Sequence, residues 1–122
     1  ISFVGRIPHD QVLDYYHLCD TMVYARSSNE VCQLVPPLKP LEAMATGKLI
    51  ICSDLPPLLD YLDNGNNGLC FKTDSLEGLE TAMRKALHPT PEIKAMPENA
   101  KAFIAKHHQW EQVAKTLAFM DD

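Results

Sequence analysis

The chain has 122 residues, 46% of them hydrophobic and 22% charged, which is enough for one globular domain with its own core and excludes a disordered tail. Its net charge of -5 and its scattered lysines and arginines exclude a phosphate-neutralising basic stripe, so we expect no nucleic-acid partner. No apolar run approaches the roughly 20 residues that span a bilayer, which indicates a cytoplasmic protein, at most peripheral to the inner face of a membrane.

Alternating strand and helix patterns fill the first two thirds of the chain. Short apolar runs bounded by turn residues predict strands at residues 1–4, 22–25, 49–52 and 69–71. Helix patterns lie between them: one after Pro8, one at 41–46 that ends at Gly47, and one from about Pro57. This alternation predicts an α/β fold, a Rossmann-like parallel sheet with helices on both faces.

Helices alone are predicted for the rest of the chain. Asp74 and Glu77 have the spacing of a capping box, which would begin a longer helix. Two further helices close the chain, one beginning at Pro97 and a last one that contains Trp110. We expect their apolar stripes to be packing surfaces. Residues 1–122 read as one unit, or as part of one.

The cysteines and histidines show no metal-ligand spacing. No Cys-x-x-Cys pair occurs, which disfavours a zinc ribbon and a disulfide framework. Cys52 and Cys70 lie in strand patterns, where we expect reduced core thiols. His107 and His108 are adjacent, and on a helix they point about 100° apart. We therefore expect no metal and no cofactor.

The loop after the second predicted strand concentrates polar residues. In open α/β sheets, ligands bind outside the carboxyl ends of the strands, and this loop, residues 25–40, is long for a strand-to-helix connection. It carries Lys39, a point charge for phosphate, and leads into the helix that holds Glu42. The Glu42 carboxylate could accept both hydroxyls of a ribose, or it could only complement the helix dipole. These patterns leave both readings open.

Several sequence motifs of the chain resemble those of one protein family. PLKPLEAMATGKLIICSD, followed by NGNNGLCF, resembles the C-terminal, donor-binding half of retaining glycosyltransferases with the GT-B architecture, the "glycosyl transferases group 1" family. The opening ISFVGRIPHDQVLDYYHLCDTMVYARSS and the ending HHQWEQVAKTL are similar to other passages of that family. The resemblance implies transfer of a hexose, with retention, from a UDP- or GDP-linked sugar to a sugar, lipid or polysaccharide acceptor, with no metal needed for the chemistry.

Site residues follow from the same resemblance. It implies that Glu42 binds ribose and that the backbone around Leu38 and Lys39 contacts the nucleotide and diphosphate. Arg26 matches an arginine found in one branch that shares the PLKPLE wording. The segment 29–33 would face the sugar through Asn29, Glu30 and Gln33. The catalytic residues stay unassigned.

The sequence departs from the family pattern in three places. Members usually carry a second glutamate, separated by seven residues from the first, and Leu34 stands at that spacing before Glu42. Pro56 and Pro57 stand where glycines are common. Two further strands with an Arg and a Lys, and an acceptor domain before them, normally precede the matched region. We therefore expect a partial domain, inactive alone, in which strand 1–4 pairs directly with strand 22–25, swaps with a neighbour in an oligomer, or relies on another chain.

Two other functions compete with glycosyl transfer. Leu34 in place of an acid favours a non-catalytic nucleotide-binding or assembly module derived from the same fold. A receiver-like signalling domain would need acidic residues at the end of its first strand, where Val4, Gly5 and Arg6 lie instead. The second alternative therefore fits poorly.

Overall fold

Three short parallel strands form the sheet of the protein. The computed structural model describes residues 1–63 and 65–107. Strands β1 (Thr21–Tyr24), β2 (Leu49–Ser53) and β3 (Leu69–Phe71) lie in the order β1-β2-β3, and both pairs are parallel. The register places Met22 beside Ile50 and Cys52 beside Cys70. Because the strands are parallel, their carboxyl ends meet at one edge of the sheet, and three of the four predicted strands are confirmed.

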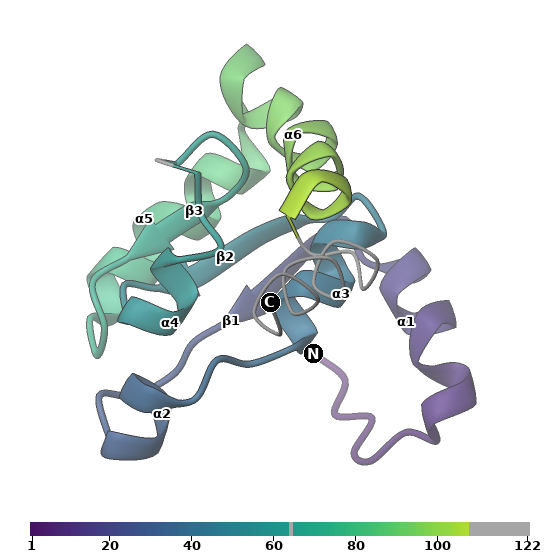
Figure 1. Ribbon diagram of the computed structural model, residues 1–122, viewed down its shortest axis with the longest axis horizontal. Helices are drawn as coiled ribbons and strands as arrows, with labels where there is room; N and C mark the ends of the chain where they lie inside the picture. The colour runs from purple at the N-terminus through teal and green to yellow at the C-terminus, as the bar shows by residue number, and fades with distance from the viewer. Residues whose placement is uncertain (64, 108–122) are drawn as a thin grey trace, which may run out of the picture.

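Helices precede and follow each strand (Figure 1). A 3-10 turn, η1 (His9–Gln11), leads into α1 (Val12–Leu18). The remaining helices are α2 (Glu30–Leu34), α3 (Lys39–Ala45), α4 (Pro56–Leu59), α5 (Leu76–Leu87) and α6 (Pro91–His107). The α2 helix lies inside the long loop after β1, which the sequence patterns had left without an element.

Both faces of β2 are buried, so the core has two halves. Ile50 and Cys52 face one way and pack against residues of α3 and α4. Ile51 faces the other way and packs with Phe71 and Ala82 of α5. The α6 helix contributes to both halves of the core, with Ala100 on the first side and Ile93 and Met96 on the second. This arrangement confirms the predicted α/β sheet with helices on both faces.

The first residues of the chain do not form the predicted strand. Residues 1–8 have no regular structure, and the side chains of Ile1 and Phe3 are almost fully exposed. In the part of the chain that the structure describes, β1 pairs only with β2, so residues 1–4 do not pair with it directly. A strand is stable only when its backbone N–H and C=O groups find a partner strand. An apolar run without such a partner does not form a strand.

The helix expected to begin at Pro97 begins six residues earlier. Pro91 opens α6, and the Thr90 hydroxyl accepts a hydrogen bond from the backbone N–H of Ile93 at 3.4 Å. Pro97 lies inside the helix, where it removes one backbone hydrogen bond. Met96 and Ala100 are buried on either side of it, and this packing holds the helix together. The predicted last helix, with Trp110, lies outside the described residues.

The residue that caps α5 is Ser75 and not Asp74. The Ser75 hydroxyl accepts a hydrogen bond from the backbone N–H of Gly78 at 3.0 Å. Asp74 adopts a left-handed backbone conformation instead, with φ of 61°. The prediction of a capping box starting at Asp74 was therefore wrong by one residue.

Candidate functional site

Glu42 lies in the first turn of α3, at the carboxyl-end side of β1. The prolines of the PPLKPLE stretch end the preceding loop, and Pro40 is buried at the start of the helix. Glu42 itself is exposed, and its Oε2 accepts a hydrogen bond from the hydroxyl of Tyr16 at 3.0 Å. Tyr16 belongs to α1 and is only 6% exposed. Figure 1 shows α1 and α3 side by side, so an exposed carboxylate is held by a buried phenol of the neighbouring helix.

A second phenol holds the backbone of the same helix turn. The hydroxyl of Tyr24, the last residue of β1, donates a hydrogen bond to the carbonyl oxygen of Lys39 at 3.0 Å. Burial, together with the neighbouring Tyr16, raises the pKa of Tyr24. Burial and the Glu42 carboxylate raise the pKa of Tyr16. Both phenols therefore keep their protons at neutral pH and act as hydrogen-bond donors.

Arg26, the second residue of the loop after β1, is anchored through its backbone. Its N–H donates to the Oγ of Ser53, a fully buried residue at the end of β2, at 2.7 Å. Its guanidinium Nη1 donates to the carbonyl oxygen of Val35 at 3.1 Å. The side chain thus ties together the two ends of the segment that contains α2. Lys39, at the other end of the loop, is exposed and makes no ion pair with a described residue.

Two of the three residues expected to face the sugar are used to fold α2. Asn29 caps the helix, and its Oδ1 accepts from the backbone N–H of Cys32 at 2.9 Å. The Gln33 side chain donates through Nε2 to the carbonyl oxygen of Ser28 at 2.9 Å. The carboxylate of Glu30 is exposed in the first turn of α2. Glu30 is therefore the acidic side chain that α2 presents to solvent, while Leu34, at the family's usual acidic position, is 76% exposed.

Leu38 and the polar contacts across the sheet edge complete the site. The carbonyl oxygen of Leu38 accepts from the backbone N–H of Glu42 at 3.2 Å. On the other side, Asp74 Oδ2 accepts from the Ser28 hydroxyl at 2.7 Å, which links the loop after β1 to the start of α5. Sequence reasoning missed this link. The only local signal was that aspartate tolerates the left-handed conformation better than most residues.

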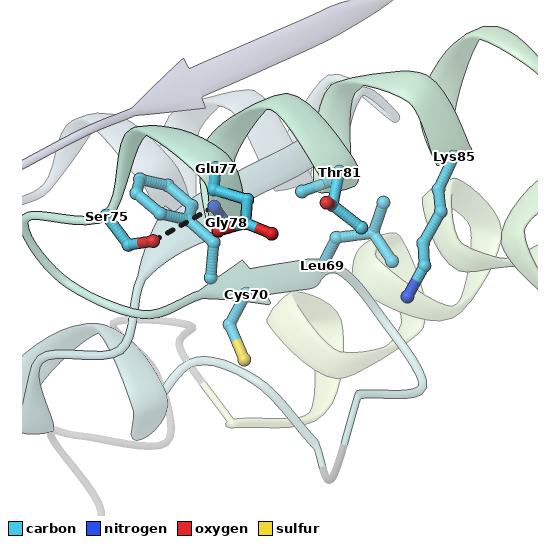
Figure 2. Close-up of a pocket in the computed structure, with 9 residues that line it drawn as sticks. Leu69, Cys70, Ser75, Glu77, Gly78, Thr81 and Lys85 are labelled. Atoms are coloured by element: carbon cyan, nitrogen blue, oxygen red, sulfur yellow. Dashed lines mark hydrogen bonds between the residues drawn. The ribbon is translucent and has the colours of Figure 1, made fainter.

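Three pockets lie around these residues. A pocket of about 560 Å³ lies beside the Glu42 turn, and its lining includes Arg6, Tyr16, Met22, Tyr24 and Lys39. Another, of about 360 Å³, lies between α5 and β3, as Figure 2 shows with Ser75, Gly78 and Lys85. The second pocket contains none of the predicted site residues. A third pocket, of about 270 Å³, is lined by Arg26 together with Ser53 and Asp74. The first pocket therefore adjoins the Glu42 turn, and the third adjoins the start of the loop after β1.

The thiols and carboxylates do not form a metal centre in residues 1–63 and 65–107, where no three His, Cys, Asp or Glu side chains converge. All four cysteines are free. Cys52 is a core thiol, as predicted, but Cys70 is exposed. Strand β3 lies at an edge of the sheet, and alternate residues of an edge strand can face solvent. Over the same described residues, no helix is long and apolar enough to cross a bilayer.

Solved structures with this arrangement define the class of domain. The chain superposes on sucrose-phosphate synthase from Thermosynechococcus elongatus with a TM-score of 0.74 and 22% identity, over 98% of this chain and 29% of that one. It superposes on the C-terminal domain of a glycosyl transferase group 1 family protein from Francisella tularensis with a TM-score of 0.70 and 15% identity, over 90% and 53%. The fold is that of a GT-B glycosyltransferase domain.

The family follows from the sequence. The profile described as "Glycosyl transferases group 1" matches residues 1–117, so the chain belongs to this family, and the resemblance of the motifs is confirmed. It is 28% identical to the lipopolysaccharide core biosynthesis mannosyltransferase LpsB of Rhizobium meliloti, over 97% of this chain and 32% of that protein. It is also 28% identical to glycogen synthase of Mycobacterium tuberculosis, over 95% and 27%. The chain thus spans less than a third of the length of these relatives.

Proposed function

We propose that this chain is the donor-binding part of a retaining hexosyltransferase that uses a nucleotide-diphosphate sugar. One observation carries the proposal: the Glu42 carboxylate is exposed in the first turn of α3 and is held there by Tyr16. An ionised carboxylate accepts hydrogen bonds at about four positions, so Glu42 can still receive both hydroxyls of a ribose. The donor is UDP- or GDP-linked.

Cationic side chains near Glu42 would bind the diphosphate. Lys39 is exposed three residues before Glu42 and lines the adjoining pocket. Its ammonium, with the backbone around Leu38, would offset the negative charge that develops on the leaving diphosphate. Arg26 would add charge from the start of the loop, and Glu30 from α2 would face the sugar. Asn29 and Gln33 would shape that segment from within.

The acceptor is a sugar, a lipid or a polysaccharide. Support comes from relatives that are named for lipopolysaccharide core and glycogen synthesis. The proposed role is therefore in polysaccharide, lipopolysaccharide or glycolipid synthesis, with any contact to the membrane being peripheral. The chain would act together with an acceptor domain, since it covers less than a third of those relatives.

Titration of UDP and of GDP into the intact protein tests the nucleotide site. Replacing Glu42→Ala removes two charge-assisted hydrogen bonds, which should weaken binding about 10- to 100-fold. The matched control is Glu77→Ala, because Glu77 is an exposed glutamate in the first turn of α5 and complements that helix dipole in the same way. Equal affinities for wild type and Glu42→Ala would remove Glu42 from the site.

A second candidate function is a nucleotide-binding module without catalytic activity. Leu34 favours it, because an exposed leucine occupies the position where family members usually carry an acidic residue. The two candidates differ in turnover of UDP-glucose or GDP-mannose by the intact protein. Sugar transfer or release that is lost in Glu42→Ala, with the fold intact, excludes the non-catalytic module. NMR of the anomeric proton of the product then decides between retention and inversion.

A further inference from the structure

The side chain of Glu42 has a fixed orientation although it is exposed. A surface glutamate ordinarily samples several rotamers, and fixing them costs up to about 2 kcal/mol of entropy. Here the Tyr16 hydroxyl donates to Oε2 at 3.0 Å. Tyr16 is 6% exposed, so the packing of its ring fixes the position of its hydroxyl. The orientation of the carboxylate is therefore set in the absence of any ligand.

The helix turn that carries Glu42 is fixed by a second phenol. Tyr24 donates to the carbonyl oxygen of Lys39 at 3.0 Å. Tyr24 ends β1, whereas Tyr16 comes from α1, so two separate elements hold one turn of α3. The backbone and the carboxylate of this turn are thus both held by tyrosines of neighbouring elements.

We infer that Tyr16 is a positioning residue for nucleotide binding, which holds the Glu42 carboxylate in the orientation that accepts ribose hydroxyls. This inference rests on the proposed function, in which Glu42 binds ribose. Tyr16 acts through Glu42 and touches no part of the ligand. Its hydroxyl occupies one of about four acceptor positions on the carboxylate and leaves three for the ligand.

The direction of the hydrogen bond supports this role. Burial, and then the contact with Glu42, raise the pKa of Tyr16, so the phenol keeps its proton over the working pH range. The protonated phenol is thus the donor of this hydrogen bond, and Oε2 of Glu42 is the acceptor. A carboxylate oriented before the ligand arrives loses less side-chain entropy on binding, and preorganisation of this kind raises affinity.

The test removes one oxygen atom and leaves the buried ring in place. Tyr16→Phe is titrated with UDP, with GDP, and with dideoxynucleotides that lack both ribose hydroxyls. We expect UDP or GDP to bind about three- to tenfold more weakly to Tyr16→Phe than to wild type. The dideoxynucleotides should bind both proteins equally, because they make no contact with the carboxylate. A purely structural role for Tyr16 would weaken all the nucleotides alike.

Two further variants complete the design. Tyr61→Phe is the matched control, since Tyr61 is 6% exposed, as Tyr16 is, but does not line the pocket beside Glu42. We expect it to bind like wild type. In a Glu42→Ala background, Tyr16→Phe should cause no additional loss, because the group that it positions is gone.

The outcomes separate this inference from the proposed function. If Glu42→Ala weakens binding but Tyr16→Phe does not, the positioning role is overturned and the ribose site stands. The same conclusion follows if the loss of affinity in Tyr16→Phe persists with dideoxynucleotides or in the Glu42→Ala background. If wild type and Glu42→Ala bind UDP and GDP equally, the ribose site itself fails, and the positioning role fails with it. Thermal unfolding of each variant verifies that the protein is folded at the temperature of the titrations.

Discussion

The buried hydroxyl of Ser53 bonds to both backbone groups of Arg26. Its Oγ accepts from the Arg26 N–H at 2.7 Å and donates to the Arg26 carbonyl oxygen at 2.9 Å. Ser53 ends β2 and Arg26 follows β1, so the hydroxyl continues the link between the two strands where backbone pairing stops. The starting point of the loop after β1 is thereby fixed to the centre of the sheet.

Replacing Ser53→Ala should destabilise the protein by about 1–3 kcal/mol, because the Arg26 N–H loses its partner in a part-buried place. Urea unfolding followed by circular dichroism measures the change. Ser2→Ala is the control, since Ser2 is exposed in the unpaired first segment, and its effect should stay within about 0.5 kcal/mol. Equal stabilities of the two variants would contradict the bridging role of Ser53.

Asp74 combines a strained backbone with two favourable contacts. Its φ is 61°, and its Oδ2 accepts from the hydroxyl and the N–H of Ser28 at 2.7 and 3.3 Å. Asp74→Ala loses the contacts and keeps the strain, whereas Asp74→Gly loses the contacts and relieves the strain. We therefore expect Asp74→Gly to be more stable than Asp74→Ala by about 1 kcal/mol. The reverse order in urea unfolding would show that Asp74 leaves the left-handed region in solution.

The cysteines should differ in their reaction with a thiol reagent at pH 8. Cys70 is exposed and should react fastest in the native protein, and Cys19 and Cys32 more slowly. Cys52 is fully buried, and burial raises the pKa of its thiol to about 12, so it has almost no thiolate to react. Mass spectrometry of peptides from the labelled protein gives the order. Labelling of Cys52 at the rate of Cys70 without denaturant would contradict its buried position.

Alkaline pH should lower the stability of the fold through the same thiol. Its pKa is raised on folding from 9.0 to about 12, so the folded state favours the protonated form. This contribution is present below about pH 9, and it is lost as pH rises towards 12 because the unfolded chain ionises first. The urea midpoint should therefore fall less steeply above pH 9 in Cys52→Ala than in wild type. Buried tyrosines add to the slope in both proteins, so the difference between the proteins is the quantity to measure.

Gly68 allows the turn before β3 to lie against the core. A Cβ at this position would lie 2.7 Å from Ile50 Cγ1 and 2.8 Å from Leu62 Cδ2. Gly68→Ala should cost about 1–3 kcal/mol through overpacking. The cost should shrink when Leu62→Ala removes one of the two clashing groups. Strictly additive losses in the double variant would show that the contact with Leu62 carries none of the cost.

Local sequence patterns predicted the helices and strands whose formation can be recognised from their own residues. Strand β2 was predicted nearly to its ends because a continuous apolar run is visible in the sequence itself, and in the structure all five of its residues are buried. The segment at residues 1–4 was mistaken for a strand because its apolar residues carry no information about whether a neighbour is available for pairing. Pro97 was mistaken for a helix start because proline disfavours a helix interior, and only the burial of Met96 and Ala100 shows how the helix tolerates it.

The candidate site also has features that local sequence predicted and features that depend on distant parts of the chain. The position of Glu42 near the start of a helix followed from its place after three prolines and before an alanine-rich run. Its partner Tyr16 comes from 26 residues earlier, and no local spacing reports such a contact. The uses of Asn29 and Gln33 as internal supports of α2 were also hidden, because a polar residue in a loop can serve either folding or binding. The assignment of ligand roles to these residues stays a prediction.

Two side-chain hydroxyls fix the two ends of the loop after β1, which allows the sequence between those ends to vary. Ser53 fixes Arg26 at its entrance, and Tyr24 fixes Lys39 at its exit, both through main-chain atoms. Main-chain anchors do not depend on which side chains stand at residues 27–38. Residues of that stretch that do not support α2, such as Glu30, can therefore be replaced, and with them groups that would meet a sugar, while the carboxylate of Glu42 keeps its place.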